Sequence, residues 1–356
     1  MNYLLIIAIS LVCMLGGRWL FKKRKLLDKP KADQKQARKP VPTLLWIFLF
    51  ISFVLVVAIV FPEYLHNSLF RGLIIAGVII VLPALLDELH YLGYHTFKVS
   101  PLIRLFTQMI WSGVALWIAG ISVEEVSFFG SHLAVAPWIF FVGFAIRAVL
   151  CINAINWFDY ANGQSSGVAG IGFLTIFLLV HLVVIPHYPT ISIEHLSTLL
   201  LVKNLSFILF ILSSIGAMFE WRPIGLLRDV GTMFLWFSLA YLSVIGGAKI
   251  GTLVVSLSLV MFDAIRVGIH RIFVLKSNPM NGDYRHIHHR LIRLGRSRGE
   301  VRAFVWIFSL VMMILMLLQG GNSTGKIIIF ILMALIFFGV NAYLFWVKKL
   351  PVGMEK

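Results

Sequence analysis

Long apolar stretches separated by short polar segments run along the whole chain. Eleven of them approach or exceed the roughly 20 residues with which a helix crosses about 30 Å of hydrocarbon. They lie near 2–20, 43–61, 69–86, 102–122, 137–155, 166–186, 197–218, 231–247, 250–270, 302–319 and 326–347. The pattern predicts an all-α polytopic membrane protein with about eleven transmembrane helices, and 1–356 are expected to form a single integral membrane domain.

Two segments refine this picture. The residues around Gly130, within 123–135, predict a short β-hairpin between the fourth and fifth helices, and nothing else predicts extended structure. The segment 302–356 predicts two C-terminal helices and a short cytoplasmic tail. Regularly alternating strand patterns are not seen, which argues against a membrane β-barrel.

Composition and charge narrow the class further. Hydrophobic residues make up 60% of the chain and charged residues 13%, far outside the range of soluble globular domains. The net charge is +16, but the basic residues flank apolar stretches without an aromatic binding platform, which argues against a nucleic-acid partner. Cys13 and Cys151 lie in apolar stretches, so neither a disulfide framework nor a thiolate metal site is expected.

The basic residues also predict the orientation in the membrane. A dense basic cluster between 18 and 39 follows the first apolar stretch, and no small-residue cleavage site is seen, so this stretch is interpreted as a retained helix. Because basic loops stay in the cytoplasm, the N-terminus is expected outside and the C-terminus inside the plasma membrane. The only basic residues within or beside the loops that are then expected outside are Arg71, Lys249 and Lys326.

Polar side chains gather on the predicted cytoplasmic face. They are Asp87 and Glu88 after the third stretch; Asn153, Asn156, Asp159 and Asn162 after the fifth; Asp229 before the eighth; Asp263, Arg266 and His270 in the ninth; and Arg285, His286, His288, His289 and Arg290 in the loop beyond it. Such groups at a membrane helix end are costly to desolvate, so they persist where they line a wet cavity or bind a polar partner.

This combination of side chains suits phosphoryl transfer. Mg²⁺, with Mn²⁺ as the alternative, takes a few carboxylates and leaves its other positions to water and phosphate oxygens. Transfer at phosphorus requires mainly positioning and neutralised charge, which a metal and cationic side chains provide. The sequence therefore predicts a metal-dependent phosphotransferase with its site at the cytoplasmic face.

Five ordered blocks between about Leu27 and Gly295 resemble the polyprenyl-phosphate N-acetylhexosamine-1-phosphate transferases, glycosyltransferase family 4 in the superfamily of phospho-N-acetylmuramoyl-pentapeptide transferases. The blocks are Leu27–Pro30 with Arg38–Pro42; Asp87-Glu88 with Ser100–Leu105 and Gln108; Asn153–Gly163; Asp229–Leu235; and Phe262–Val267 with Arg285–Leu291. The third is similar to the pattern Asn-x-x-Asn-x-x-Asp-Gly-x-Asp-Gly, and the fourth to Gly-Asp-Ser-Gly-Ser-x-Phe-Leu.

The blocks depart from the family patterns at several positions. Glu88 stands where a second aspartate is usual, and Arg228 stands where a glycine precedes Asp229. Tyr160 replaces a glycine and Asn162 replaces the second aspartate of the third block. The segment Phe219–Pro223 also differs from the usual Asn-x-Pro-Pro pattern.

The resemblance implies a reaction and its participants. A sugar-1-phosphate, with N-acetylhexosamine-1-phosphate as the first choice, would pass from a UDP-sugar to polyprenyl (undecaprenyl) phosphate. UMP would be released and cell-envelope glycan synthesis initiated. The chemistry is compatible with direct attack by the lipid phosphate and with a covalent enzyme intermediate.

The resemblance also implies roles for individual residues. Asp229 would be the leading metal ligand, Asp159 would hold the metal shell or the nucleotide, and Asp87 would orient or deprotonate the lipid phosphate and contribute to the metal site. Glu88 would support Asp87 or contact the metal. The implied substrate-binding residues are Asn153, Asn156, Asn162, Arg285, His286, His288, His289 and Arg290.

Plain structural roles remain open at this stage. Asp87-Glu88 fits a solvated helix end, Asp229 fits an N-cap, and Asp263 with Arg266 fits an ion pair on a helix face. The three histidines fit a Zn²⁺ site less well, because no thiolate accompanies them. At the level of function, the alternatives are a catalytically decayed homologue that only binds lipid phosphate and a membrane transporter.

Overall fold

The structure, a computed structural model, describes residues 3–28, 40–121, 125–128, 131–158, 161–187, 192–245, 257–277 and 285–346. Within these residues, eight helices are long and apolar enough to cross a membrane. They are α1 (Tyr3–Lys23), α3 (Ser68–Tyr91), α4 (Pro101–Ala119), α5 (Pro137–Phe158), α6 (Gln164–Leu179, continued by the π-helical turn Val180–Val184 and α7, Ile185–His187), α8 (Ile193–Trp221), α13 (Arg298–Leu318) and α14 (Ser323–Trp346). The all-α polytopic fold is confirmed.

Among the described residues, the three remaining predicted spans contain helices that are shorter or more polar, and 250–256 of the ninth span lie outside the described residues. The helices are α2 (Trp46–Val60), α9 (Arg228–Ile245) and α11 (Ser258–Ile269), which a π-helical turn, His270–Val274, continues. α9 has polar residues because it is the innermost helix: every residue from Val230 to Ser243 is buried in protein. A helix that is buried all round faces no lipid, so it can carry serine, threonine and tyrosine where neighbours bind them.

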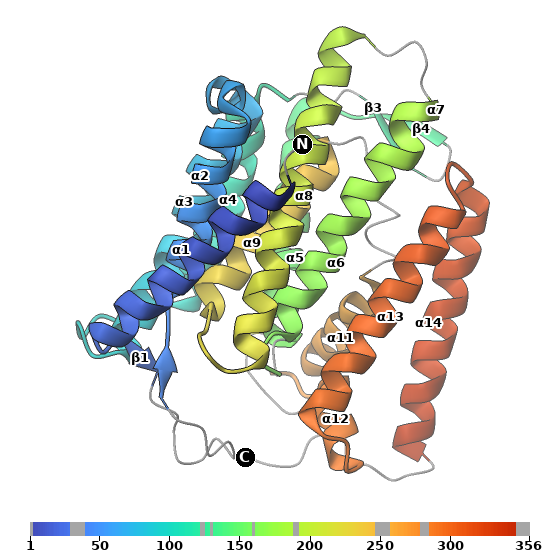
Figure 1. Cartoon of the computed structure of the whole chain (residues 1–356). Helices are drawn as coiled ribbons and strands as arrows, with labels where there is room; N and C mark the ends of the chain where they lie inside the picture. Colours follow the sequence, from blue (N-terminus) through green and yellow to red (C-terminus); the bar gives the residue numbers. More distant parts are fainter. Residues whose placement is uncertain are drawn as a thin grey trace.

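Two short antiparallel strand pairs lie at opposite ends of the bundle (Figure 1). β3 (Glu125–Phe128) pairs with β4 (Ser131–Ala134), which confirms the predicted hairpin around Gly130. β1 (Leu27–Asp28) pairs with β2 (Val41–Pro42), so the prediction that nothing else is extended was wrong. Strands of two residues are too short to produce an alternating sequence pattern, which is why this pair was missed.

Several polar side chains inside the bundle bind one another or the backbone. The Tyr241 hydroxyl of α9 donates to the carbonyl oxygen of Leu69 at 2.8 Å, and Arg147 of α5 donates to Ser243 Oγ at 2.7 Å. Asn204 Nδ2 donates to the Tyr64 hydroxyl at 2.9 Å, beside the short 3-10 helix Pro62–His66. This bond gives Asn204 a structural role, and neither Asn204 nor Arg147 was among the site residues predicted from the sequence.

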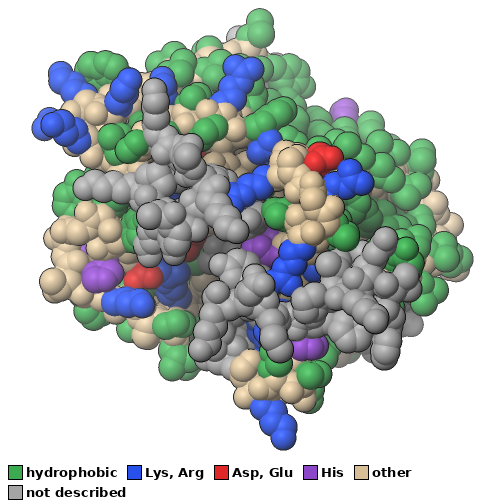
Figure 2. Space-filling view, turned by 90° about the horizontal axis from the view of Figure 1, so that it is seen from below, with side chains coloured by type: hydrophobic (Ala, Val, Ile, Leu, Met, Phe, Trp, Pro, Cys, Tyr) green, Lys and Arg blue, Asp and Glu red, His purple; other side chains and the backbone are tan. Residues whose placement is uncertain are grey.

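The loops predicted to face the cytoplasm lie at the end of the bundle that also carries β1 and the short helix α12 (Ile287–Arg293), the lower end in Figure 1. The β3–β4 hairpin and α7 lie at the other end. Figure 2 shows the lower face, on which lysine, arginine and histidine side chains gather with a few carboxylates. The fold therefore collects the polar chemistry of distant sequence segments at one end.

Replacing Tyr241 with phenylalanine is expected to lower the thermal melting temperature of the purified protein in detergent. The variant loses the hydroxyl that donates to Leu69 in the core, and a lost buried hydrogen bond costs about 1 kcal/mol. Tyr94→Phe is the matched control, because Tyr94 is 63% exposed. Equal melting temperatures for the two variants would contradict the structural role of Tyr241.

Candidate active site

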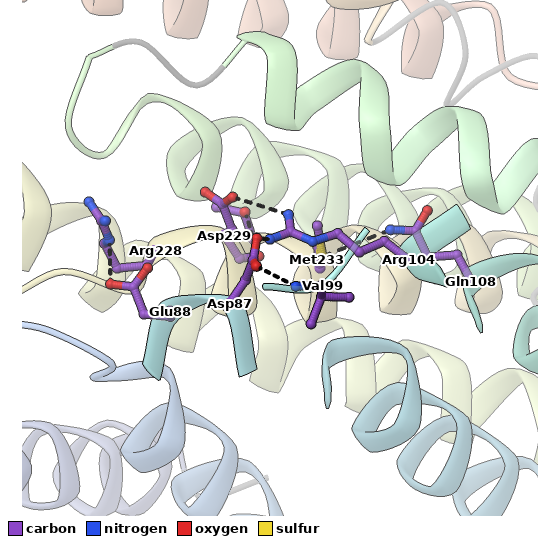
Figure 3. A network of polar contacts seen from close by, with 9 residues as sticks. Asp87, Glu88, Val99, Arg104, Gln108, Arg228, Asp229 and Met233 are labelled. Atoms are coloured by element: carbon purple, nitrogen blue, oxygen red, sulfur yellow. Dashed lines mark hydrogen bonds and ion pairs between the residues drawn. The ribbon is translucent and has the colours of Figure 1, made fainter. Parts of the chain in front are cut away.

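The two adjacent acids at the end of α3 have different partners (Figure 3). Asp87 forms an ion pair with Arg104 Nη2, and its Oδ1 accepts a hydrogen bond from Val99 N at 3.1 Å. Glu88 Oε1 accepts from Arg228 Nε at 2.8 Å and from the Thr43 hydroxyl at 3.3 Å. Successive residues of a helix do not share a face, so the paired acids divide into two separate contacts.

Arg104 links the second and fourth sequence blocks. Its Nη1 lies 3.8 Å from Asp229 Oδ2, so one guanidinium contacts the carboxylates of both Asp87 and Asp229. The start of α4 positions it: Pro101 occupies the first turn, and Ser100 Oγ accepts from Ile103 N at 3.3 Å. The Asp229 side chain is 51% exposed, whereas that of Asp87 is 22% exposed. Asp229 is thus the more accessible of the two acids.

A fixed turn leads into α9 and places Asp229 in its first helical turn. Glu220 at the end of α8 is buried, and its carboxylate accepts from Leu227 N at 2.9 Å and from the Ser166 hydroxyl at 2.7 Å. Leu226 N donates to the carbonyl of Pro42 in β2 at 2.9 Å. Glu220 was noted in the sequence only as part of a departure from the family pattern. Its contacts show that it holds the turn before Asp229.

Arg228, next to Asp229, has a backbone φ of 64°, which is the left-handed region. A residue with a Cβ atom is disfavoured there by about 1–2 kcal/mol, whereas glycine adopts it freely. This observation explains why the family pattern has glycine at the position. Here the side chain of Arg228 binds Glu88 and lies 3.9 Å from Asp28 Oδ1.

Asn153 of the third block is bound to the second block. Its Nδ2 donates to Gln108 Oε1 at 2.7 Å and to the Val149 carbonyl at 2.8 Å, and Gln108 Nε2 contacts Met233 Sδ at 3.8 Å. Residues from the second, third and fourth blocks therefore meet between α4, α5 and α9. The side chain of Asn156 and the whole of Asp159 lie outside the described residues, so the roles predicted for them remain predictions.

The end of the third block is held by α13. Arg302 Nη1 donates to the carbonyl oxygen of Asn162 at 2.9 Å, and its guanidinium lies 4.8 Å from the ring centre of Trp221. Gly163 has a φ of 81°, and an added Cβ would lie 2.7 Å from the Ala217 carbonyl. Arg302 stood at the edge of a predicted span and carried no other signal, so the sequence did not identify it.

The histidine loop is anchored on Asp263 of α11. This fully buried carboxylate binds His286 Nδ1 at 2.7 Å, accepts from Ile287 N at 3.1 Å and pairs with Arg266 Nη2 at 2.8 Å. Arg266 also donates to the Arg285 carbonyl at 2.7 Å. The Asp263–Arg266 ion pair is confirmed, and the pair additionally fixes the start of α12.

The histidine-loop residues predicted to bind substrate differ in accessibility. His286, His288 and Arg290 are almost fully buried, whereas Arg285 and His289 are half-buried. Arg290 Nη1 donates to Asn341 Oδ1 of α14 at 3.0 Å, and burial lowers the pKa of Arg290 to about 10. Burial, assisted by the neighbouring His289, lowers the pKa of His288 well below its usual value. His288 is therefore a neutral side chain at physiological pH.

The residues that the structure describes contain no group of three or more histidine, cysteine, aspartate or glutamate side chains that could hold a metal ion. Two of the three predicted ligands, Asp87 and Asp229, do converge, since both contact the guanidinium of Arg104. The third, Asp159, lies outside the described residues. The donor set that can be described is thus two carboxylates aimed at one position that a cationic group now occupies.

The bundle and its polar end define a polytopic membrane protein with converging acidic, basic and imidazole groups at one end. The family model of glycosyl transferase family 4 matches residues 70–247, which are 178 of the 356 residues, and the chain belongs to this family. A comparison with curated proteins finds no match to the chain. Family membership makes it a membrane sugar-phosphate transferase in general, with a sugar donor and a lipid-phosphate acceptor.

Acidic pH is expected to destabilise the histidine loop through His288. The pKa of His288 is lowered in the folded protein and is about 6.5 in an unfolded chain, so the unfolded chain binds the proton first as the pH falls. Stability is therefore lost below about pH 6.5. The melting temperature should fall less between pH 7.5 and 5.5 in His288→Gln than in the original protein.

His195→Gln is the control for this pH series, because His195 is exposed. It should show the same pH dependence as the original protein. An identical acid-induced fall in the His288→Gln and His195→Gln variants would contradict the assignment of the effect to His288.

Proposed function

We propose that the protein transfers a sugar-1-phosphate, with N-acetylhexosamine-1-phosphate as the first choice, from a UDP-sugar to polyprenyl phosphate, releasing UMP. The observation that carries the proposal is the convergence of Asp87 and Asp229 on Arg104. These three residues come from the paired-acid and α9 blocks that resemble the transferases, and the match to glycosyl transferase family 4 covers all three positions. The site would face the cytoplasm at the plasma membrane.

The proposed metal site uses the same convergence. Asp229 and Asp87, with Asp159 as the third candidate, would hold Mg²⁺ or Mn²⁺, because hard divalent cations prefer carboxylate oxygens. When bound, the ion would neutralise charge on the donor pyrophosphate. The half-exposed Asp229 is the leading ligand, since its carboxylate is the most accessible of the described acids at this position.

The residues of the chain supply positioning and proton transfer. Asp87 would orient the lipid phosphate or remove its proton, so that a phosphate oxygen attacks the sugar-bearing phosphorus. A bond forms between that oxygen and phosphorus while the bridging pyrophosphate bond breaks, and the electron pair leaves with UMP. In a covalent variant of the reaction an enzyme carboxylate makes the first attack. Exchange of labelled UMP without lipid acceptor distinguishes the two routes.

The histidine loop, which includes α12, would contribute cationic and imidazole groups that bind the UDP-sugar. Arg285 and His289 are its half-buried members and are the ones proposed to contact pyrophosphate and sugar. His286 and Arg290 are bound to Asp263 and Asn341, so they would act mainly by holding the loop in shape. Asn153 is held by Gln108 and would shape the inner wall of the nucleotide site, together with Asn156 and Asn162.

Asp229→Ala is expected to abolish transfer, and Asp87→Asn to lower turnover with nucleotide binding largely retained. The assay contains the purified protein, Mg²⁺, polyprenyl phosphate and a panel of radiolabelled UDP-N-acetylhexosamines, and it measures lipid-soluble product. Glu63→Ala is the control, because Glu63 is an exposed acid in the 3-10 helix. Equal activity of the two site variants would contradict the assignment.

The same assay separates the other functions. Lipid-phosphate binding without product from any sugar nucleotide would favour a catalytically decayed homologue. Movement of ions or solutes across reconstituted vesicles would favour a transporter.

Arg104→Gln is expected to increase the rise in melting temperature that Mg²⁺ causes. In the original protein the guanidinium offsets one of the two negative charges of Asp87 and Asp229 and occupies the position between them, so a divalent cation must displace it. Without the guanidinium the two carboxylates repel each other, and the ion gains more by binding. Arg71→Gln, a change of an exposed arginine at the start of α3, should leave the shift unaltered. A smaller Mg²⁺ shift in Arg104→Gln would contradict the shared cation position.

A further inference from the structure

Two positions at which this chain departs from the family patterns contact each other. Glu88 stands where the second aspartate is usual, and Arg228 stands where glycine is usual. Arg228 Nε donates to Glu88 Oε1 at 2.8 Å, although the two residues are 140 positions apart in the sequence. The departures are therefore a physically coupled pair and not two independent losses.

The backbone of Arg228 retains the conformation for which glycine is suited. Its φ of 64° is left-handed, and Leu227 on one side is held by Glu220. The arginine side chain brings contacts that a glycine lacks: Glu88, the buried Asp28 at 3.9 Å, and the ring of Tyr91 at 5.4 Å from the guanidinium carbon. These contacts offset the backbone strain.

The side chain of Glu88 points toward Arg228 and away from the position of the Arg104 guanidinium, which Asp87 and Asp229 share (Figure 3). Its side chain is 9% exposed, and its Oε1 binds both Arg228 and Thr43. Glutamate is one methylene longer than aspartate, which extends the reach of the carboxylate toward the arginine. The guanidinium of Arg228 supplies this buried carboxylate with a positive partner, without which the charge would be strongly destabilising.

We propose that Glu88 and Arg228 form a matched positioning pair that fixes the first turn of α9, and with it Asp229, and that Glu88 is neither a metal ligand nor an acid or base. This inference replaces the supporting or metal-binding role that the sequence suggested for Glu88. The turnover experiment that tests this inference rests on the proposed transferase function, whereas the stability experiment does not.

The stability experiment is a double-mutant cycle on the full-length protein in detergent, without substrates. Arg228→Ala and Glu88→Ala should each lower the melting temperature, and the double variant should lower it by clearly less than the sum. Arg228→Lys should recover part of the loss. Glu88→Asp with Arg228→Gly restores the usual family residues and should melt above Arg228→Gly alone. Additive losses, or no recovery in the Asp/Gly variant, would overturn the pair.

The turnover experiment uses the neutral double variant Glu88→Gln with Arg228→Gln, whose amides can still hydrogen-bond. A positioning pair predicts a loss in kcat far smaller than that of Asp229→Ala. A loss as large as that of Asp229→Ala, at an unaltered melting temperature, would show that a member of the pair takes part in the chemistry and would overturn the proposal.

The matched control is Glu300→Gln with Arg296→Gln, an exposed ion pair at 3.3 Å at the start of α13, where glutamine can still accept the capping hydrogen bond that Glu300 accepts from Ser297 N. It should alter neither melting temperature nor turnover. If the original protein transfers no sugar phosphate, the proposed function fails while the melting cycle still decides the pairing.

Discussion

The neutralisation of charge at the end of an apolar bundle is the constraint on which this structure depends. A carboxylate removed from water is strongly destabilising unless a cation or several donors accompany it. The buried acids of the described residues meet this requirement mostly with groups from distant segments: Glu88 and Asp28 with Arg228, Asp263 with Arg266 and His286, and Glu220 with backbone and hydroxyl donors. These contacts fix the ends of α3, α8, α9 and α11 relative to one another.

The sequence predicted the fold class well because a membrane helix leaves a long, uniform apolar signal. It placed five blocks at one face, and the second, third and fourth of them meet among the described residues: Asp87 and Asp229 share Arg104, which was not singled out, and Asn153 contacts Gln108. It did not predict what Arg302, Glu220 or Arg147 do, because their main partners are distant in the sequence and leave no local pattern. The β1–β2 pair was missed because its strands are two residues long.

The C-terminal helices lie beyond the region that matches the family, yet they support the site. Arg302 of α13 holds the carbonyl of Asn162 in the third block, and Asn341 of α14 binds Arg290 of the histidine loop. The partner of Arg302 is a backbone carbonyl, and the partner of Asn341 is a buried arginine side chain. The two helices therefore stabilise loops that the matched region and the segment after it provide, which explains why arginine and asparagine occur in or beside such apolar helices.

The two arginines beside the paired acids differ in how readily another cation can replace them at their carboxylate partners. Arg228 is bound to a nearly buried glutamate, and releasing it would leave a charge in an apolar environment. Arg104 instead bridges to an aspartate that is half in solvent, so water or an incoming cation can replace it at small cost. One guanidinium beside two carboxylates leaves one negative charge uncompensated, and the half-exposed Asp229 keeps that charge in contact with water. If Asp87 and Asp229 hold the proposed divalent cation, it would supply the positive charge that these carboxylates require, and Arg104 would be available to bind a phosphate of the sugar donor.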